Sequence, residues 1–181
     1  MLSTSDALDA GISKTTLSHL VKEGRLERFA HGQYVLPDRL PDELHILQQR
    51  ISRMVYSHET ALFLHDMSER TPPRQSVTIP SNMKLPKTFA GDYKVYYVKP
   101  DLFELGMTSL SSKMGHMVIA YDAERTICDV LRSRSRVDSQ TIAAAMKNYA
   151  LRKGKDLNRL GQYAAAFRVT RLLRQYLEVL L

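Results

Sequence analysis

The apolar positions near the N-terminus recur with helical spacing and predict two short helices joined by a tight turn. Ser3 supplies N-cap chemistry for the first helix, and Gly11 ends it. Ser13 caps the second helix, whose inward positions follow i, i+3, i+4 spacing: Leu17, Leu20 and Val21. A small Ala7 four residues before the turn glycine leaves room for two helices to cross steeply. Gly24 is placed to end the second helix in a left-handed conformation.

A β-hairpin is predicted directly after these helices. Residues 26–29 and 33–36 have strand character and flank a turn at His31 and Gly32. Helix, turn, helix and hairpin is the order in which a winged helix-turn-helix presents its second helix to the major groove. The alternative is the solvated face of a small helical hairpin that never meets DNA. The expected DNA contacts are hydrogen-bonding or cationic side chains: Ser13, Lys14, Thr15, Thr16, Ser18, His19, Lys22, Arg28 and His31.

The prolines of residues 37–41 predict a boundary between domain 1–38 and domain 39–181. In the second domain we expect a helix capped by Asp42 and ending near Met54, then a second helix over 57–65. Three β-branched or aromatic runs predict strands, and the poorly periodic residues 100–115 predict a mobile loop. Everything after Ala123 is predicted helical, with caps at Asp122, Asp138 and Asp156. The expected fold class is therefore α+β, a small sheet beside a helical C-terminal half.

Composition narrows the class of protein only a little further. Among 181 residues no apolar run approaches the ~18 residues of a membrane span, and no secretory signal is visible. The single cysteine, Cys128, excludes an internal disulfide and fits a reducing compartment. It lies in an apolar series, so a buried structural thiol is favoured over a nucleophile. These features predict a cytoplasmic protein.

The net charge of +7 does not come from the first domain. Residues 1–38 hold four basic and five acidic side chains, whereas residues 132–174 hold eleven basic and two acidic ones. A basic surface there could meet nucleic acid or an acidic protein, or it could be only the solvated side of helices. The predicted basic interaction surface comprises Arg132, Arg134, Arg136, Lys147, Arg152, Lys153, Lys155, Arg159, Arg168, Arg171 and Arg174.

Six segments give the chain a resemblance to the AbiEi family, the antitoxin and regulator half of AbiE abortive-infection systems. The segments are residues 10–18, 24–28, 32–37, 56–62, 64–67 and 124–129. The resemblance implies a winged-helix domain that represses its own operon, and a C-terminal antitoxin domain that counters a nucleotidyltransferase-like toxin in phage defence. Family members usually carry one more helix before the helix-turn-helix. We therefore expect that first helix to be missing here.

Residues that could carry catalysis are few. The chain has no Gly-rich phosphate loop, His-Glu-x-x-His helix or cysteine cluster. A histidine and acid group could hint at a metal site, and three acids could resemble nuclease carboxylates. For both sets a structural role is favoured, Asp122 and Glu124 belonging to a helix start. The two sets are His58, Glu59, His65 and Asp66, and Asp122, Glu124 and Asp129.

A third set, around one predicted strand, could stack single-stranded bases, although aromatic residues at strand spacing more often pack in a core. It comprises Tyr93, Tyr96 and Tyr97 with Lys94 and Lys99. We therefore expect a non-enzymatic regulator and antitoxin without cofactor or metal, whose partners are operator DNA and the toxin. The alternatives are a plain regulator with a ligand-sensing or oligomerising second domain, and a metal-dependent nucleic-acid-processing enzyme.

Overall fold

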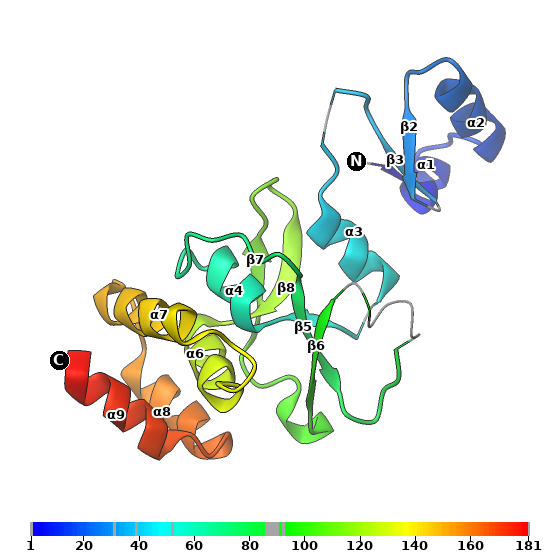
Figure 1. Ribbon diagram of the computed structural model, residues 1–181. Helices are drawn as coiled ribbons and strands as arrows, with labels where there is room; N and C mark the ends of the chain where they lie inside the picture. Colours follow the sequence, from blue (N-terminus) through cyan, green and yellow to red (C-terminus); the bar gives the residue numbers. More distant parts are fainter. Residues whose placement is uncertain are drawn as a thin grey trace. The chain divides into compact units, whose positions relative to one another are not determined.

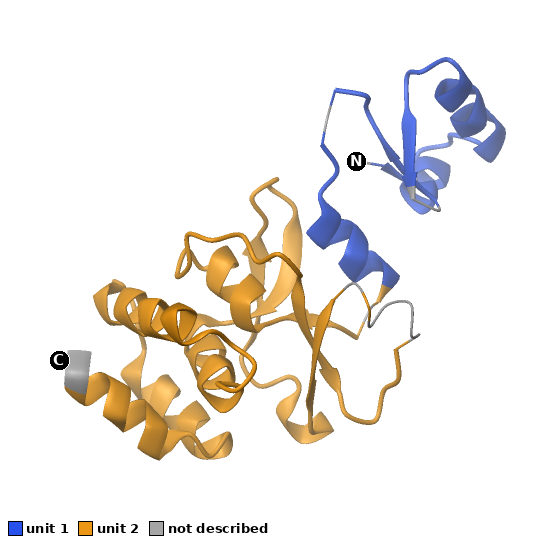
Figure 2. Cartoon of the chain, viewed as in Figure 1, with its two compact units in different colours: residues 1–50 blue, residues 51–181 orange. Residues whose placement is uncertain are grey.

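The structure, a computed structural model, describes residues 2–30, 32–38, 40–51, 53–85, 91 and 93–180. The chain forms two compact units, residues 1–50 and 51–181 (Figure 2). The predicted boundary at residue 38 lies before the observed one at residue 50. The prediction therefore assigned helix α3 (Glu43–Arg50) to the second domain. In the structure Gln49 of α3 accepts a 2.7 Å hydrogen bond from Gln33 Nε2, so α3 belongs with the first unit.

The first unit contains the two helices, the turn and the hairpin in the predicted order. Ser3 and Asp6 form a capping box at the start of α1, and Ser13 Oγ accepts from the Thr16 amide at the start of α2. The hairpin strands pair antiparallel, and a two-residue strand that the sequence did not predict joins them in the order β1-β3-β2. The elements are β1 (Leu2–Ser3), α1 (Thr4–Asp9), α2 (Lys14–Lys22), β2 (Glu27–Ala30) and β3 (Gln33–Val35).

The second unit packs helices against a five-stranded mixed sheet in the order β6-β5-β4-β8-β7 (Figure 1). Strands β5 and β6 are parallel, as are β4 and β8, while β4 runs antiparallel to β5 and β7 antiparallel to β8. Helix order and sheet confirm the α+β class. The elements are β4 (Val55–Tyr56), α4 (His58–Leu64), β5 (Ser76–Pro80), β6 (Lys94–Val98), η1 (Pro100–Leu102), β7 (Met107–Ser111), β8 (Met117–Tyr121), α6 (Ala123–Arg132), α7 (Ser139–Leu151), α8 (Leu157–Ala166) and α9 (Thr170–Leu180).

Two predictions made for domain 39–181 are wrong. The helix expected to reach Met54 ends at Arg50, because the buried residues after it enter the central strand β4. The segment predicted as a mobile loop contains β7, which pairs with β8 over five residues from Met107 to Ser111. The sequence of β7 is weakly apolar because the strand is an edge strand and only partly buried, which leaves little periodic signal.

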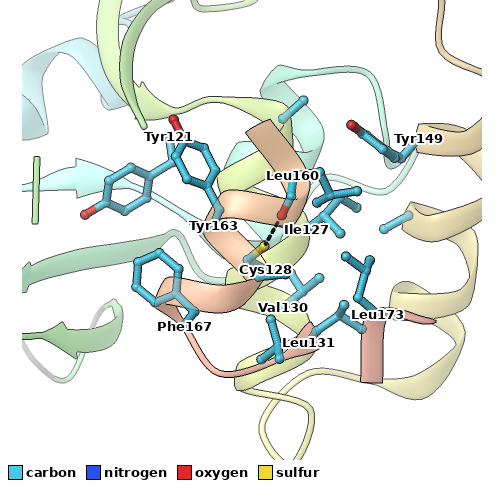
Figure 3. Close-up of a cluster of buried hydrophobic side chains, with 14 of the residues drawn as sticks. Tyr121, Ile127, Cys128, Val130, Leu131, Tyr149, Leu160, Tyr163, Phe167 and Leu173 are labelled. Carbon is cyan, nitrogen blue, oxygen red and sulfur yellow. Dashed lines mark hydrogen bonds between the residues drawn. The ribbon is translucent and has the colours of Figure 1, made fainter. Parts of the chain in front are cut away.

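The core of the second unit lies where α6 is covered by α7, α8 and α9 (Figure 3). Helix α6 is buried almost along its whole length, from Ala123 to Leu131. Cys128 lies in the middle of this cluster, with Sγ 3.9 Å from the carbonyl oxygen of Leu160. The predicted burial of Cys128 is confirmed, and it raises the pKa of the thiol to about 12. Within the described residues, no helix is long and apolar enough to cross a bilayer.

Candidate nucleic-acid interface

Helix α2 is held by a small core of its own unit. Leu17 is fully buried on its inner face, and the fully buried Ala7 of α1 lies where the helices cross. The turn is closed by a 2.7 Å hydrogen bond from the Ile12 amide to the Ala7 carbonyl oxygen, with Gly11 at φ +78°. Gly24 at φ +69° ends the helix in the left-handed region, as predicted. These contacts leave the opposite face of α2 to solvent.

The exposed face of α2 carries the predicted polar set. Within it Ser13 Oγ lies 2.8 Å from Thr16 Oγ1, and Ser18 Oγ donates to the Lys14 carbonyl oxygen at 3.0 Å. His19 Nδ1 lies 3.3 Å from a carboxylate oxygen of Glu23. The remaining side chains bond to no other described residue, which leaves them available to a ligand: Lys14, Thr15 and Lys22.

The hairpin adds less to this surface. Arg28 is exposed on β2, opposite Tyr34 of β3. The prediction for His31 falls outside the described residues. Phe29 and Leu36 are large apolar side chains that stay exposed on this unit.

The basic side chains of the second unit do not converge on one spot. Arg132, Arg136 and Arg152 donate to backbone carbonyl oxygens of Tyr97, Val95 and His65. Arg159 lies near the carboxylates of Asp122 and Asp156, and Lys155 donates to the Arg152 carbonyl oxygen. Those with no partner among the described residues are Arg134, Lys147, Lys153, Arg168, Arg171 and Arg174. Lys147, Arg168 and Arg171 line three different hollows, so a single basic surface stays a prediction.

The histidines and acids of the first candidate set do not form one cluster, and each makes contacts of its own. His58 stacks on Tyr96 with ring centroids 3.4 Å apart, and its two ring nitrogens bond Ser57 and Ser133. Burial, reinforced by Arg132 and other nearby cations, lowers the pKa of His58 well below its usual value, so its ring stays neutral. Lys94 and Lys113 pair with Glu59 and Asp66, and His65 Nε2 bonds the Tyr121 carbonyl oxygen. No three such groups within the described ranges could hold a metal ion.

The three acids of α6 and its cap also have structural partners. Asp122 caps α6 as predicted, accepting from the Arg125 amide at 2.8 Å. Glu124 accepts from Tyr149 Oη at 3.0 Å, and Asp129 accepts from Arg125 Nε at 3.1 Å. Burial raises the pKa of both Asp122 and Asp129.

Arg125, whose guanidinium is completely buried, is not among the residues singled out from the sequence. The i,i+4 spacing of Arg125 and Asp129, in a helix with many apolar residues, is the sequence signal from which a buried ion pair could have been predicted.

The tyrosines of the third candidate set do not share one face of β6, because the strand is pleated. Tyr96 is buried against His58, whereas Tyr97 is 52% exposed on the other face. Tyr96 therefore packs in the core, the role favoured from the sequence, whereas Tyr97 points to the other face because successive residues of a strand face opposite ways.

Three comparisons place the chain among known proteins. Residues 1–37 match the model of a family described as "Transcriptional regulator, AbiEi antitoxin". No curated protein matches the sequence significantly. Among solved structures, the crystal structure of RV2827C protein from Mycobacterium tuberculosis is similar, with a TM-score of 0.61 and 15% identity over 97% of this chain and 71% of that one. The family likeness thus covers the first unit up to β3, and the structural likeness shows a shared fold across nearly the whole chain.

Proposed function

We propose that this chain is a DNA-binding transcriptional regulator whose first unit is a winged helix-turn-helix. The observation that supports it most is the coincidence of two independent findings on residues 1–37. The regulator family model matches this segment, and the segment exposes the polar face of α2, where Lys14, Thr15 and Lys22 have no partner among the described residues. In the proposed complex α2 enters the major groove, with Arg28 and His31 near the phosphate backbone or minor groove.

Substitutions on α2 are expected to separate base readout from phosphate contact. Thr15→Ala and His19→Ala should reduce discrimination between the promoter of the chain's own operon and scrambled DNA, each by about 1–3 kcal/mol. Lys22→Ala should weaken binding to both DNAs alike and lower the salt slope by about one. Fluorescence anisotropy over a salt series measures these effects. Arg25→Ala removes an equal charge just beyond α2 and is the matched control. Unchanged affinity in all three α2 variants would contradict the placement.

The second proposal is that residues 39–181 act as the antitoxin of a nucleotidyltransferase-like toxin, in the cytoplasm and without enzymatic turnover. It rests on the resemblance to AbiEi proteins, which extends into segments 56–62 and 124–129, and on the AbiEi family match of the first unit. The eleven basic side chains between Arg132 and Arg174 are the proposed interaction surface; those without a partner among the described residues lie on α7, on α9 and in the turns that follow α6, α7 and α8. The histidine and carboxylate sets both support a binding protein rather than an enzyme, since each of their histidines and carboxylates contacts a protein group instead of converging on one site.

Growth rescue tests the antitoxin proposal with the full chain. The gene adjacent to that of the chain is induced in cells that also carry the wild-type chain, a Lys14→Ala/Thr15→Ala/Lys22→Ala variant, or an empty vector. We expect growth arrest with the vector and rescue by both chains, because toxin neutralisation is assigned to residues 39–181. Rescue by neither, with both chains soluble, would leave the chain a plain regulator.

A further inference from the structure

A hollow of about 400 Å³ lies at one edge of the second unit, within the size range of small-ligand sites. Two of its residues, Ser81 and Lys99, directly follow the parallel strands β5 and β6, whose last residues pair as Pro80 with Val98. The carboxyl ends of parallel strands are where ligands bind in open α/β sheets. Its far wall comes from the end of α6 and the turn between α8 and α9. Its charged and aromatic lining residues are Tyr97, Lys99, Arg132, Phe167 and Arg168.

The charged side chains described around this hollow are all cationic. Lys99, Arg132 and Arg168 line it, and no aspartate or glutamate is among its described lining residues. Arg132 is held in place, with Nη2 3.4 Å from the Tyr97 carbonyl oxygen and Cζ 5.4 Å from the centre of the Phe167 ring. The side chains of Lys99 and Arg168 are exposed and bond no other described residue. Three cations from three separate elements therefore line one hollow, and the described residues supply no balancing acid there, an arrangement suited to an anion with several oxygens.

An aromatic face borders these cations. Tyr97 is half exposed while its neighbour Tyr96 is buried, so its side chain lies on the outer side of β6 at the hollow. A ring beside a cationic cluster suits a base beside its phosphate, because base stacking supplies affinity without sequence preference. The hollow thus offers a cationic surface to the phosphate of a nucleotide and an aromatic surface to its base.

The backbone at Arg168 gives an independent indication. Arg168 follows α8 with φ +58°, in the left-handed region where glycine is the usual residue. Its amide bonds the Ala165 carbonyl oxygen at 3.1 Å, which closes the turn at the end of α8. Side chains held in this strained conformation gather at functional sites. A glycine would make the same turn without strain, so what Arg168 adds at this position is its guanidinium group.

We propose that this hollow binds a nucleotide, with its phosphate between Lys99, Arg132 and Arg168 and its base on Tyr97. The site is separate from α2 and does not depend on the proposed regulatory function. The same chemistry belongs to a free nucleoside phosphate and to the phosphorylated 5′ end of a single strand. Neither requires a metal or a covalent step.

Calorimetric titration of the full chain compares ATP, GTP, CTP and UTP with a single-stranded hexanucleotide carrying or lacking a 5′-phosphate. We expect binding that requires the phosphate. Saturation by a mononucleotide assigns the site to free nucleotides, and saturation by the phosphorylated strand alone assigns it to strand ends. Equal binding of the two hexanucleotides, or no binding of any probe up to about 1 mM, would overturn the proposal.

Arg168→Gly is the sharpest variant, because it removes a charge while relieving backbone strain. We expect its melting temperature to stay the same or rise and its affinity for the bound probe to fall about tenfold or more. Tyr97→Ala should also weaken binding, and Tyr97→Phe should restore it, because stacking needs only the ring. Arg70→Gln removes an exposed charge elsewhere on the second unit and is the matched control. Wild-type affinity in Arg168→Gly would place any observed binding elsewhere on the chain.

Discussion

Replacing Arg125 by leucine is expected to lower the free energy of unfolding by about 3–5 kcal/mol, the cost of leaving one charge of a buried pair without its partner. The side chains of Arg125 and Asp129 are almost completely buried, and Nε lies 3.1 Å from a carboxylate oxygen. Nη1 also donates to the carbonyl oxygens of Leu102 and Leu105. Leucine would leave both carbonyls and the carboxylate without these donors in a region closed to water.

The aromatic contacts of Arg125 add to this cost. Its Cζ lies 4.0 Å from the centre of the Tyr121 ring and 3.9 Å from that of Phe167, so the guanidinium is stacked between two rings. A leucine side chain fills less of this gap and leaves a cavity. Urea denaturation measures the loss, and Arg134→Leu, which removes an exposed arginine just beyond α6, is the control expected to change stability by less than about 0.5 kcal/mol.

The deficit of Arg125→Leu should also depend on pH. Burial already raises the pKa of Asp129, and the arginine is the main opposing influence. Without it the pKa rises further, so the native variant binds more protons than the unfolded chain and gains stability as the pH falls from 7 to 5. Adding Asp129→Leu should recover part of the loss, because the carboxylate that lost its partner is then removed as well. A deficit that is independent of pH and unchanged in the double variant would contradict a role for the charge.

The helix starts could be predicted because their chemistry is local. Ser13, Asp122, Asp138 and Asp156 each cap a helix where the sequence predicts a cap, and each side chain accepts from an amide three residues ahead. The polar face of α2 follows from the same reasoning, since helical periodicity alone fixes which positions oppose Leu17. Local rules thus reach the elements and the candidate DNA contacts of the first unit.

The sequence could not show what depends on distant partners. Strand β7 is recognisable only once β8 lies beside it, and β4 is too short to carry a period. The nucleotide hollow brings Lys99 together with Arg132 and Arg168, although Lys99 lies more than thirty residues before Arg132 in the sequence. Their convergence follows from the packing of α6 and α8 near the sheet edge, which no spacing along the chain reveals.

The buried pair Arg125–Asp129 and the hollow at the end of α6 share contacts, so the position of one affects the other. Arg125 fixes α6 to the loop before β7 through two carbonyl oxygens, and Arg132 lies two turns further along the same helix. Phe167 contacts both guanidinium groups, on Arg125 at 3.9 Å and on Arg132 at 5.4 Å. The geometry of the proposed phosphate site therefore depends on the same anchor that the Arg125→Leu experiment removes.

Gly106→Ala tests the close packing at this anchor and is expected to destabilise the chain by about 2–5 kcal/mol. Gly106 has φ +79°, and its carbonyl oxygen accepts from the Asp122 amide at 2.7 Å, which fixes its backbone beside the start of α6. A Cβ there would lie 2.7 Å from Arg125 Cβ and 3.3 Å from Cε2 of Tyr163. Both neighbours are buried and cannot move without disturbing the core.

Gly115→Ala is the matched control for this change. Gly115 has φ +87° in the turn between β7 and β8, so an added methyl suffers similar backbone strain, but no atom lies within 4 Å of its Cβ position. Its cost should be only the strain, about 1–2 kcal/mol. Urea denaturation of both variants then isolates the steric part as their difference. Equal losses would show that the core relaxes around Gly106, and Arg125 would not be the rigid anchor inferred from its contacts.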